Sequence, residues 1–294
     1  MRMNALPSQA FGLVVLVAGI AFAWNKLAKP LLLRHGSAPR FVLATLCVVL
    51  VGGLAGAPFW FADYGPSFSW DLPPLASRLL GAAALAFGIA GIWVMRHATQ
   101  STVRAYLIML LAYLLPIMFA ATVLHSDRFD WRAPITPAFF LIVGGLSFAG
   151  ILHLVRNDAA RLPKGLRLHM PPWVRILFIL VSILAFIWAA VLFLFPSNGP
   201  VLIATWPGDP LSSRLIGTMF FTIAVAALAA LHDAERARTA LVLYAVYGFG
   251  VVAAGIFSVA AGKPMPVAYV FGLGGLAAAA IAILSAGKLS LPLA

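Results

Sequence analysis

Charged residues are scarce in this chain. They make up 10% of its 294 residues, against 63% hydrophobic residues, and the mean hydropathy is +1.02. A soluble domain carries about a quarter charged residues, so this deficit excludes an ordinary soluble fold. The net charge of +12 does not indicate a nucleic-acid partner, because the basic residues lie between apolar runs too long for a soluble core. The composition predicts a polytopic membrane protein whose first partner is the lipid bilayer.

Cysteine and deep ionisable residues are also nearly lacking. The single cysteine, Cys47, lies inside an apolar run, which excludes an intramolecular disulfide and a cysteine metal cluster. None of the eight acidic residues lies in the middle of an apolar run, which counts against a proton-driven carrier and an intramembrane protease. The histidines fall near the ends of these runs, without the spacing of a haem or metal site. We therefore expect no cofactor, no metal and no catalytic residue.

What the chain does have is a series of apolar runs, each near the length that crosses a bilayer as a helix. Continuous apolarity indicates helices and not barrel strands. The first run is short and must extend with Lys26 and Lys29 snorkelling, and no small-residue cleavage pattern follows it. The sequence predicts an all-α integral membrane protein with nine transmembrane helices, at residues 11–24, 41–62, 75–95, 104–125, 135–155, 173–195, 211–232, 239–261 and 265–286.

Lysine and arginine gather in alternate loops. The basic segment 156–175 is the clearest case, whereas Asp63, Asp127 and Asp130 lie in loops of the other side. Cytoplasmic loops of membrane proteins carry the excess of Lys and Arg. We expect a multi-pass protein of the bacterial cytoplasmic (inner) membrane, with its N-terminus outside and its C-terminus in the cytoplasm.

One stretch occurs twice. Residues 70–81 read WDLPPLASRLLG and residues 206–217 read WPGDPLSSRLIG, so that Pro-Leu-x-Ser-Arg-Leu-x-Gly is shared. Further pairs follow at a similar offset, such as the Gly-Gly pairs 144–145 and 274–275. The pattern predicts an N-terminal helix (1–36) and two four-helix units (37–156 and 173–294), joined by a basic linker (157–172). An even number of spans per unit predicts parallel repeats around an axis along the membrane normal.

The motif carries one resemblance. Trp-x-x-x-Pro-Leu-x-x-Arg-x-x-Gly, with one extra residue after the tryptophan in the second copy, resembles a pattern of uncharacterised bacterial polytopic inner-membrane proteins. The resemblance covers the motif alone and implies no established activity. A threonine often stands near the Pro-Leu in those proteins, whereas this chain has Ala76, Ser77, Ser212 and Ser213 there.

Two interpretations of the motif stay open. Arg78 and Arg214 lie one turn into a helix, each preceded by an aspartate, Asp71 or Asp209. The first interpretation is a helix start, with proline in the first turn, a capping carboxylate and an arginine in the headgroup layer. The second is an anion site, in which both arginines hold a carboxylate or a lipid phosphate. We favour the first, because interfacial arginines are common and only deep ones are functional by default.

Aromatic residues supply the remaining candidates. Trp70 and Trp206 open the two motif copies, where amphipathic rings favour the membrane interface. Tyr113 and Tyr247 lie at equivalent depths in the membrane. They are either packing residues or the lining of a cavity between the repeats.

Three functions are compatible with this pattern. The first is a carrier or binding protein for an apolar or amphipathic small molecule or lipid, with its site between the repeats. The second is a non-catalytic subunit that packs against other membrane proteins. The third is an outer-leaflet lipid-modifying enzyme that uses Asp71, Asp209 and the arginines.

Overall fold

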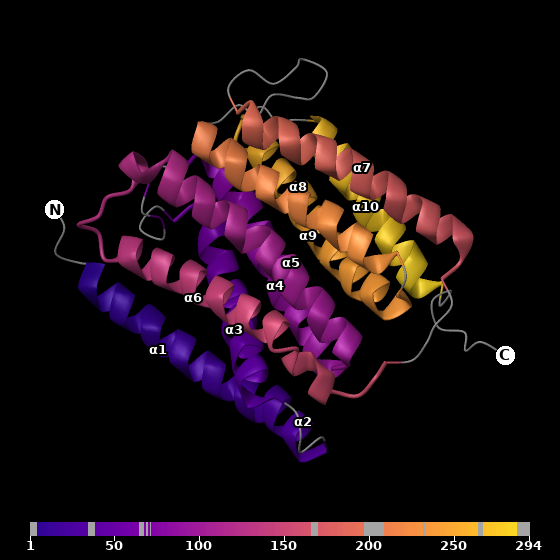
Figure 1. The fold of residues 1–294 in the computed structure, drawn as a ribbon. Helices are drawn as coiled ribbons and strands as arrows, with labels where there is room; N and C mark the ends of the chain where they lie inside the picture. The colour runs from indigo at the N-terminus through magenta and orange to yellow at the C-terminus, as the bar shows by residue number, and fades with distance from the viewer. Residues whose placement is uncertain are drawn as a thin grey trace.

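The computed structural model describes residues 5–34, 39–64, 68, 70, 72–165, 170–196, 209–231, 233–263 and 267–286. Within these ranges the chain is helical and contains no strand (Figure 1). Nine helical segments of the described part are long and apolar enough to cross a membrane. The expectation of an all-α membrane protein with nine spans is confirmed.

The nine spans follow one another in chain order. The first is continuous through three pieces, namely α1 (Ala5–Ala23), a π-helical turn η1 (Trp24–Ala28) and α2 (Lys29–Arg34). The others are α3 (Arg40–Phe61), α4 (Pro74–Arg96), α5 (Gln100–Phe119), α6 (Ile135–Val155), α7 (Pro172–Leu194), α8 (Pro210–Ala230), α9 (Ala234–Ala260) and α10 (Val267–Ser285). Short η3 (Ala120–Leu124), η4 (Ser126–Arg128) and η5 (Asp158–Arg161) complete the described helices.

Polar caps decide where several helices begin. Thr99 forms a capping box with Thr102, so α5 starts earlier than its apolar run. The Asp233 carboxylate accepts hydrogen bonds from the backbone amides of Glu235 and Arg236, so α9 likewise starts earlier in the chain than its apolar run. Hydropathy alone places these two starts too late, because the first turns are polar.

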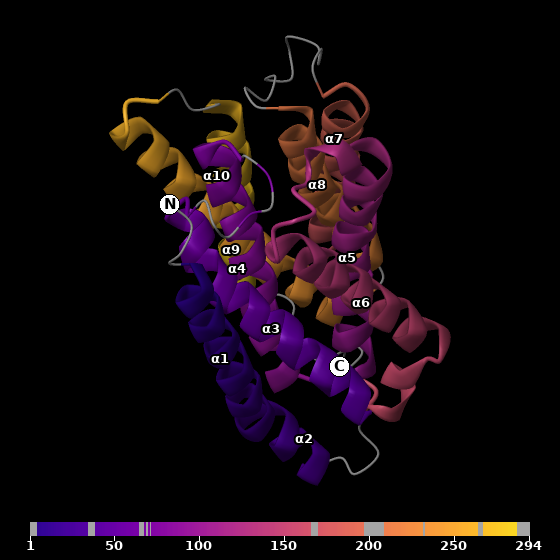
Figure 2. The same ribbon diagram turned by 90° about the vertical axis from the view of Figure 1, so that its left-hand side faces the viewer.

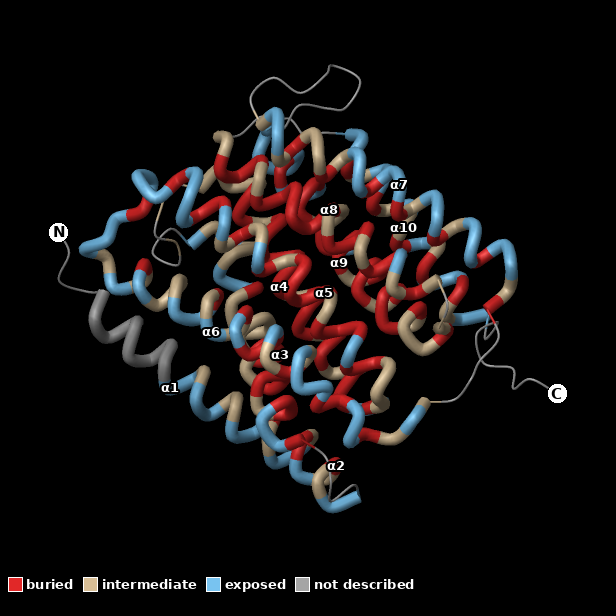
Figure 3. Tube along the Cα trace, in the orientation of Figure 1, coloured by how far each residue is buried: buried red, intermediate tan, exposed pale blue. Residues whose placement is uncertain are grey.

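Four helices form the centre of the bundle. Most of the apolar stretch of α4 and of α8 is buried, 72% in each, whereas only 28% is buried in α6, α7 and α10. The main packing partners of these central helices are α3 and α9 for α4, and α7 and α5 for α8. Figure 3 shows the buried residues concentrated along α4, α5, α8 and α9. The peripheral helices therefore face the membrane with their apolar sides.

The first span lies at one edge of the bundle. It packs chiefly along α3, and its π-helical turn also reaches α4 (Figure 2). At Gly19 an added Cβ would lie 2.7 Å from Val51 Cγ1, so this glycine lets α1 touch α3 closely. With only 17% of its apolar stretch buried, this span is the most exposed of the nine described.

Close backbone approach joins α3 to α4. A Cβ on Gly53 would lie 2.4 Å from Ala84 O and 3.1 Å from Gly88 N, both backbone atoms that cannot move aside. The neighbouring Gly52 has no heavy atom within 4 Å of the same position. The packing therefore requires glycine at position 53, whereas it leaves room for a larger side chain at position 52.

We predict that Gly53→Ala lowers the free energy of unfolding by about 1–3 kcal/mol, because the added methyl group overpacks the interface. Gly52→Ala is the matched control and leaves stability unchanged or raises it by up to about 1 kcal/mol, since alanine favours a helix. Thermal unfolding of both variants in the same detergent makes the comparison. Equal stabilities would contradict the α3–α4 packing.

Candidate functional site

The two motif copies lie at one end of the bundle, here called the motif end. It is the end at which α4 and α8 begin and at which α3 and α7 finish. In the first copy, Ser77 Oγ donates to Trp60 O at 2.7 Å and Arg78 Nε donates to Phe61 O at 3.2 Å. Both acceptors belong to the last turn of α3, whose carbonyl groups have no later helical amide to bind.

The second copy makes the same pair of contacts. Ser213 Oγ donates to Leu192 O and Arg214 Nε donates to Phe193 O, both at 3.1 Å. These carbonyls belong to the last turns of α7. We call each set a Ser–Arg clasp, because side chains near the start of one helix hold the end of the preceding helix.

The glycine that closes the motif serves the same junction. A Cβ on Gly81 would lie 3.2 Å from Ala57 O, and one on Gly217 would lie 3.3 Å from Ala189 O. Glycine therefore lets the two helices approach closely enough for the clasp. The serine, arginine and glycine of Pro-Leu-x-Ser-Arg-Leu-x-Gly thus serve this junction, and the proline stands at the first helical position.

The helix-start interpretation holds only partly at the caps. In the second copy the Asp209 carboxylate accepts from Leu211 N at 2.9 Å and Ser212 N at 3.1 Å. In the first copy the capping position is Pro73, which makes no side-chain cap. Asp71 and Trp206, which the sequence suggests as site residues, lie outside the described residues.

Each arginine also reaches a helix of the other half. Arg214 Nη1 donates to His125 Nε2, just beyond η3, which extends α5. The Arg78 guanidinium lies 6.0 Å from the ring centroid of Phe257, near the end of α9. Within the described residues Arg78 Nη1 is buried without a hydrogen-bond acceptor. The two arginines thus have separate partners, in contrast to the shared anion site that the sequence left open.

Aromatic rings surround Trp70 at the motif end. Its ring centroid lies 5.1 Å from Phe129, 5.7 Å from Phe139 and 5.7 Å from Phe68. Among the described atoms, Trp70 Nε1 is buried and has no hydrogen-bond partner. A tryptophan with a partly buried apolar body and an unused donor indicates a place where a polar group could bind.

A cavity of about 590 Å³ opens beside this tryptophan. Its walls combine carboxylates, a guanidinium and aromatic rings, and they come from both halves of the chain. They are Asp63, Phe68, Trp70, Leu72, Pro73 and Arg128 from the first half, with Asp209 and Leu211 from the second. We call it the motif-end pocket. Asp63 follows the end of α3 in the left-handed region, at φ 55°, a conformation that aspartate adopts more readily than most residues.

Tyr113 and Tyr247 lie deeper and away from this pocket. The Tyr113 ring packs 5.1 Å from Phe87, and Tyr247 is 1% exposed. Three residues beyond Tyr247, a Cβ on Gly250 would lie 2.5 Å from Ala82 Cβ, so α4 and α9 are in close contact there. Neither tyrosine lines the motif-end pocket. The contacts of Tyr113 and Tyr247 are those of residues that pack helices together.

One buried polar cluster was missed by sequence reasoning. His153 Nδ1 donates to Asp158 Oδ2 at 2.9 Å, and His153 Nε2 shares a hydrogen bond of 3.2 Å with Thr45 Oγ1. The Thr45 hydroxyl also donates to Phe41 O at 3.0 Å and is nearly buried. Although the connectivity is that of a catalytic triad, the hydroxyl is held by its own helix. The cluster ties the end of α6 to α3.

The opposite end holds a second contact between the halves. Thr99 Oγ1 donates to Glu235 Oε2 at 2.6 Å, and Ser101 Oγ donates to Asp233 Oδ2. The starts of α5 and α9 thus bind each other. Among the described residues there is no group of three or more His, Cys, Asp or Glu side chains that could hold a metal ion.

Comparison with protein-family models, curated proteins and solved structures gave no match. The proposals that follow rest on the residues and their geometry alone.

We predict that Arg78→Lys and Arg214→Lys each lower the free energy of unfolding by about 1–2 kcal/mol, because lysine lacks the Nε donor that binds the helix end. Arg132→Lys is the control, since this exposed arginine lies at the same end outside both clasps. Thermal unfolding in detergent measures all three. If Arg132→Lys is as harmful as the other two, the clasp does not stabilise the fold.

A second prediction concerns pH. Burial lowers the pKa of the His125 imidazole below its ordinary value of 6.5, and the Arg214 guanidinium lowers it further. Arg128 acts in the same direction, whereas Asp127 and Asp209 oppose it. A lowered histidine pKa means that the unfolded chain binds more protons than the folded chain. His125 therefore contributes full stability above the ordinary pKa, and this contribution is lost as the pH falls below it.

Unfolding temperatures measured between about pH 5 and about pH 8 check this. We expect the wild type to lose stability toward the acidic side and His125→Gln to lose less of it. Identical slopes for the two proteins would show that His125 does not titrate against Arg214.

Proposed function

We propose that this protein is a membrane-embedded carrier or binding protein for an amphipathic molecule, whose polar end is held in the motif-end pocket. One observation carries the proposal. The pocket is lined by residues of both halves, with a carboxylate from each, Asp63 and Asp209. Its volume of about 590 Å³ lies within the range of small-molecule sites, about 300–1,000 Å³.

The lining favours a cationic or zwitterionic head group. Two carboxylates stand against one guanidinium, Arg128, and the rings of Phe68 and Trp70 form part of the wall. Aromatic faces and carboxylates together attract an ammonium group. The Asp209 carboxylate is already engaged by the first turn of α8, whereas the Asp63 carboxylate has no hydrogen bond or ion pair within the described part of the chain and is our candidate ligand contact. Trp70 Nε1 adds a donor for the anionic part of a zwitterion.

The proposal includes a location and an orientation. We place the chain in a bacterial cytoplasmic membrane with the motif end and the N-terminus outside and the C-terminus in the cytoplasm. The support comes from charge. Lys26, Arg34 and Arg96 lie toward the opposite end, whereas Asp63 and Asp209 lie at the motif end. The pocket then opens toward the outer face of the membrane.

The proposal also includes a duplicated architecture of two parallel units, 37–156 and 173–294. It is supported by the two Ser–Arg clasps and by a further matched pair of contacts. Tyr106 Oη donates to Phe87 O at 2.8 Å, and Tyr244 Oη donates to Ile223 O at 2.7 Å. Helix α4 of the first unit packs on α9 of the second, and α8 of the second packs on α5 of the first. This reciprocal packing also supports a two-fold axis between the units. A carrier of this design would move one unit against the other around the pocket.

Binding to the purified protein tests the proposal. An alkyltrimethylammonium and an alkyl sulfate of equal chain length are titrated into protein held in a neutral maltoside detergent, and Trp fluorescence and unfolding temperature are recorded. We expect saturable binding of the ammonium compound, weakened about tenfold in Asp63→Asn, as expected for loss of one charge-assisted contact. Asparagine tolerates the left-handed backbone of residue 63, so the fold is retained.

Asp130→Asn is the matched control, because Asp130 is exposed at the same end and does not line the pocket. The control should bind as the wild type does. Equal binding of both amphiphiles, or equal weakening in the two variants, would contradict a head-group site at Asp63.

A further inference from the structure

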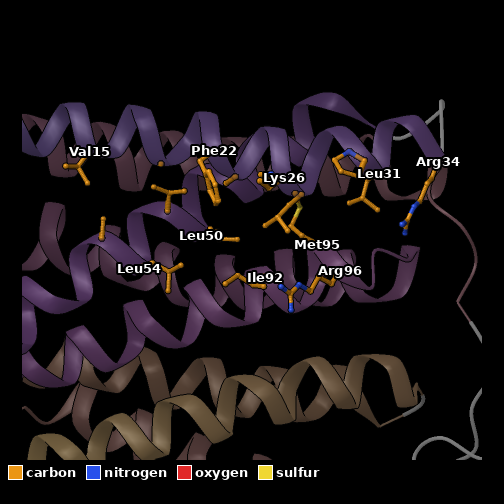
Figure 4. A pocket seen from close by; sticks show the side chains of 16 residues that line it. Val15, Phe22, Lys26, Leu31, Arg34, Leu50, Leu54, Ile92, Met95 and Arg96 are labelled. Atoms are coloured by element: carbon orange, nitrogen blue, oxygen red, sulfur yellow. The ribbon is translucent and has the colours of Figure 1, made fainter.

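A second cavity lies far from the motif-end pocket, between the first span and helices α3 and α4. Its volume is about 800 Å³ (Figure 4). The described lining is mostly apolar along its length and includes Val15, Phe22, Leu50, Leu54 and Ile92. We call it the first-span groove. The first span lies at the edge of the bundle, so the groove lies beside one of its outermost helices.

Positive charge gathers in one part of this groove. Lys26, Arg34 and Arg96 line it, and no Asp or Glu is among the described lining residues. All three are exposed side chains, from the first span and from the last turn of α4. In Figure 4 Arg34 lies at the same end as Leu31, Lys26 and Arg96 lie between that end and the middle of the groove, and Val15 and Leu54 lie toward the other end. The cavity therefore has a basic part and a long apolar part.

The local backbone builds this shape. The π-helical turn Trp24–Ala28 interrupts the first span at Lys26, while Ala28 and Leu31 are buried against the bundle. π-helical turns are rare and occur frequently at functional sites. Lys26 lies in this turn and Arg34 in the helix that follows it, and both line the groove.

We propose that the first-span groove binds an anionic phospholipid, with its phosphate at Lys26, Arg34 and Arg96 and an acyl chain along Phe22, Leu50 and Ile92. Basic pockets between membrane helices on the cytoplasmic side bind anionic head groups. A free phosphate would leave the apolar length of the groove empty, whereas an uncharged lipid would leave three cations unmatched. The proposal does not depend on the motif-end pocket, because the two cavities share no described lining residue.

The test uses the full chain purified in maltoside detergent. Phosphatidylglycerol, phosphatidylethanolamine with the same acyl chains, and inorganic phosphate are added separately, and bound lipid is counted by native mass spectrometry alongside the unfolding temperature. We expect phosphatidylglycerol to bind and to raise the unfolding temperature, and the other two to do so weakly or not at all. The double variant Arg34→Gln/Arg96→Gln should bind phosphatidylglycerol about 10- to 30-fold more weakly, as expected for two basic residues beside an anionic lipid.

Arg104→Gln/Arg175→Gln is the matched control. It removes the same charge from exposed arginines at the same end of the bundle, outside the groove. This control should bind phosphatidylglycerol as the wild type does. Equal loss in both double variants would reduce the effect to general surface charge and overturn the site. Equal binding of the two phospholipids, or displacement of phosphatidylglycerol by inorganic phosphate alone, would overturn it as well.

The wild type decides the matter even if the double variant fails to fold. Lipid that stays bound through purification should be enriched in phosphatidylglycerol over phosphatidylethanolamine, relative to the membrane from which the protein was extracted. An unenriched ratio would contradict the proposal.

Discussion

The carbonyl groups at the end of a membrane helix need donors that neither their own helix nor the lipid can supply. In this protein the backbone that follows the helix supplies some of these donors, and side chains of the next helix supply others. Ser77 and Arg78 bind the end of α3, and Ser213 and Arg214 bind the end of α7. Because each clasp joins a helix start to the preceding helix end, it sets the register of two spans at once. The glycine one turn further along lets the backbones come close enough for these bonds.

From this constraint the rest of the bundle follows. The clasped helices α4 and α8 are the most buried of the described spans, and α4 packs on α9 while α8 packs on α5. Their starts lie beside the ends of α5 and α9, where Arg214 contacts His125 and Arg78 lies over Phe257. The motif-end pocket forms at this junction, because the end of α3 and the start of α4 meet the start of α8 there. The first span stands outside the arrangement and leaves the first-span groove along its inner side.

The sequence was sufficient to predict the membrane spans and part of the role of the motif. Apolar runs predict nine crossings, because hydrophobic length is a direct requirement of the bilayer, and Asp209 was correctly expected to cap a helix. The partners of Arg78 and Arg214 could not be predicted, since a backbone carbonyl carries no sequence signal. His153 was expected at an interface, yet it is buried against Thr45, a partner 108 residues away in the chain. The first-span groove is lined in part by a π-helical turn, which hydrophobic periodicity does not reveal.

The two motif arginines act separately, each on its own helix junction. A double-mutant cycle on unfolding free energy with Arg78→Lys, Arg214→Lys and the combined variant measures this most directly. Substitutions of residues with separate partners are additive to within about 0.3–0.5 kcal/mol, and we expect that result here. A coupling energy of about 1 kcal/mol or more would mean that the arginines share a partner, which would contradict the separate clasps.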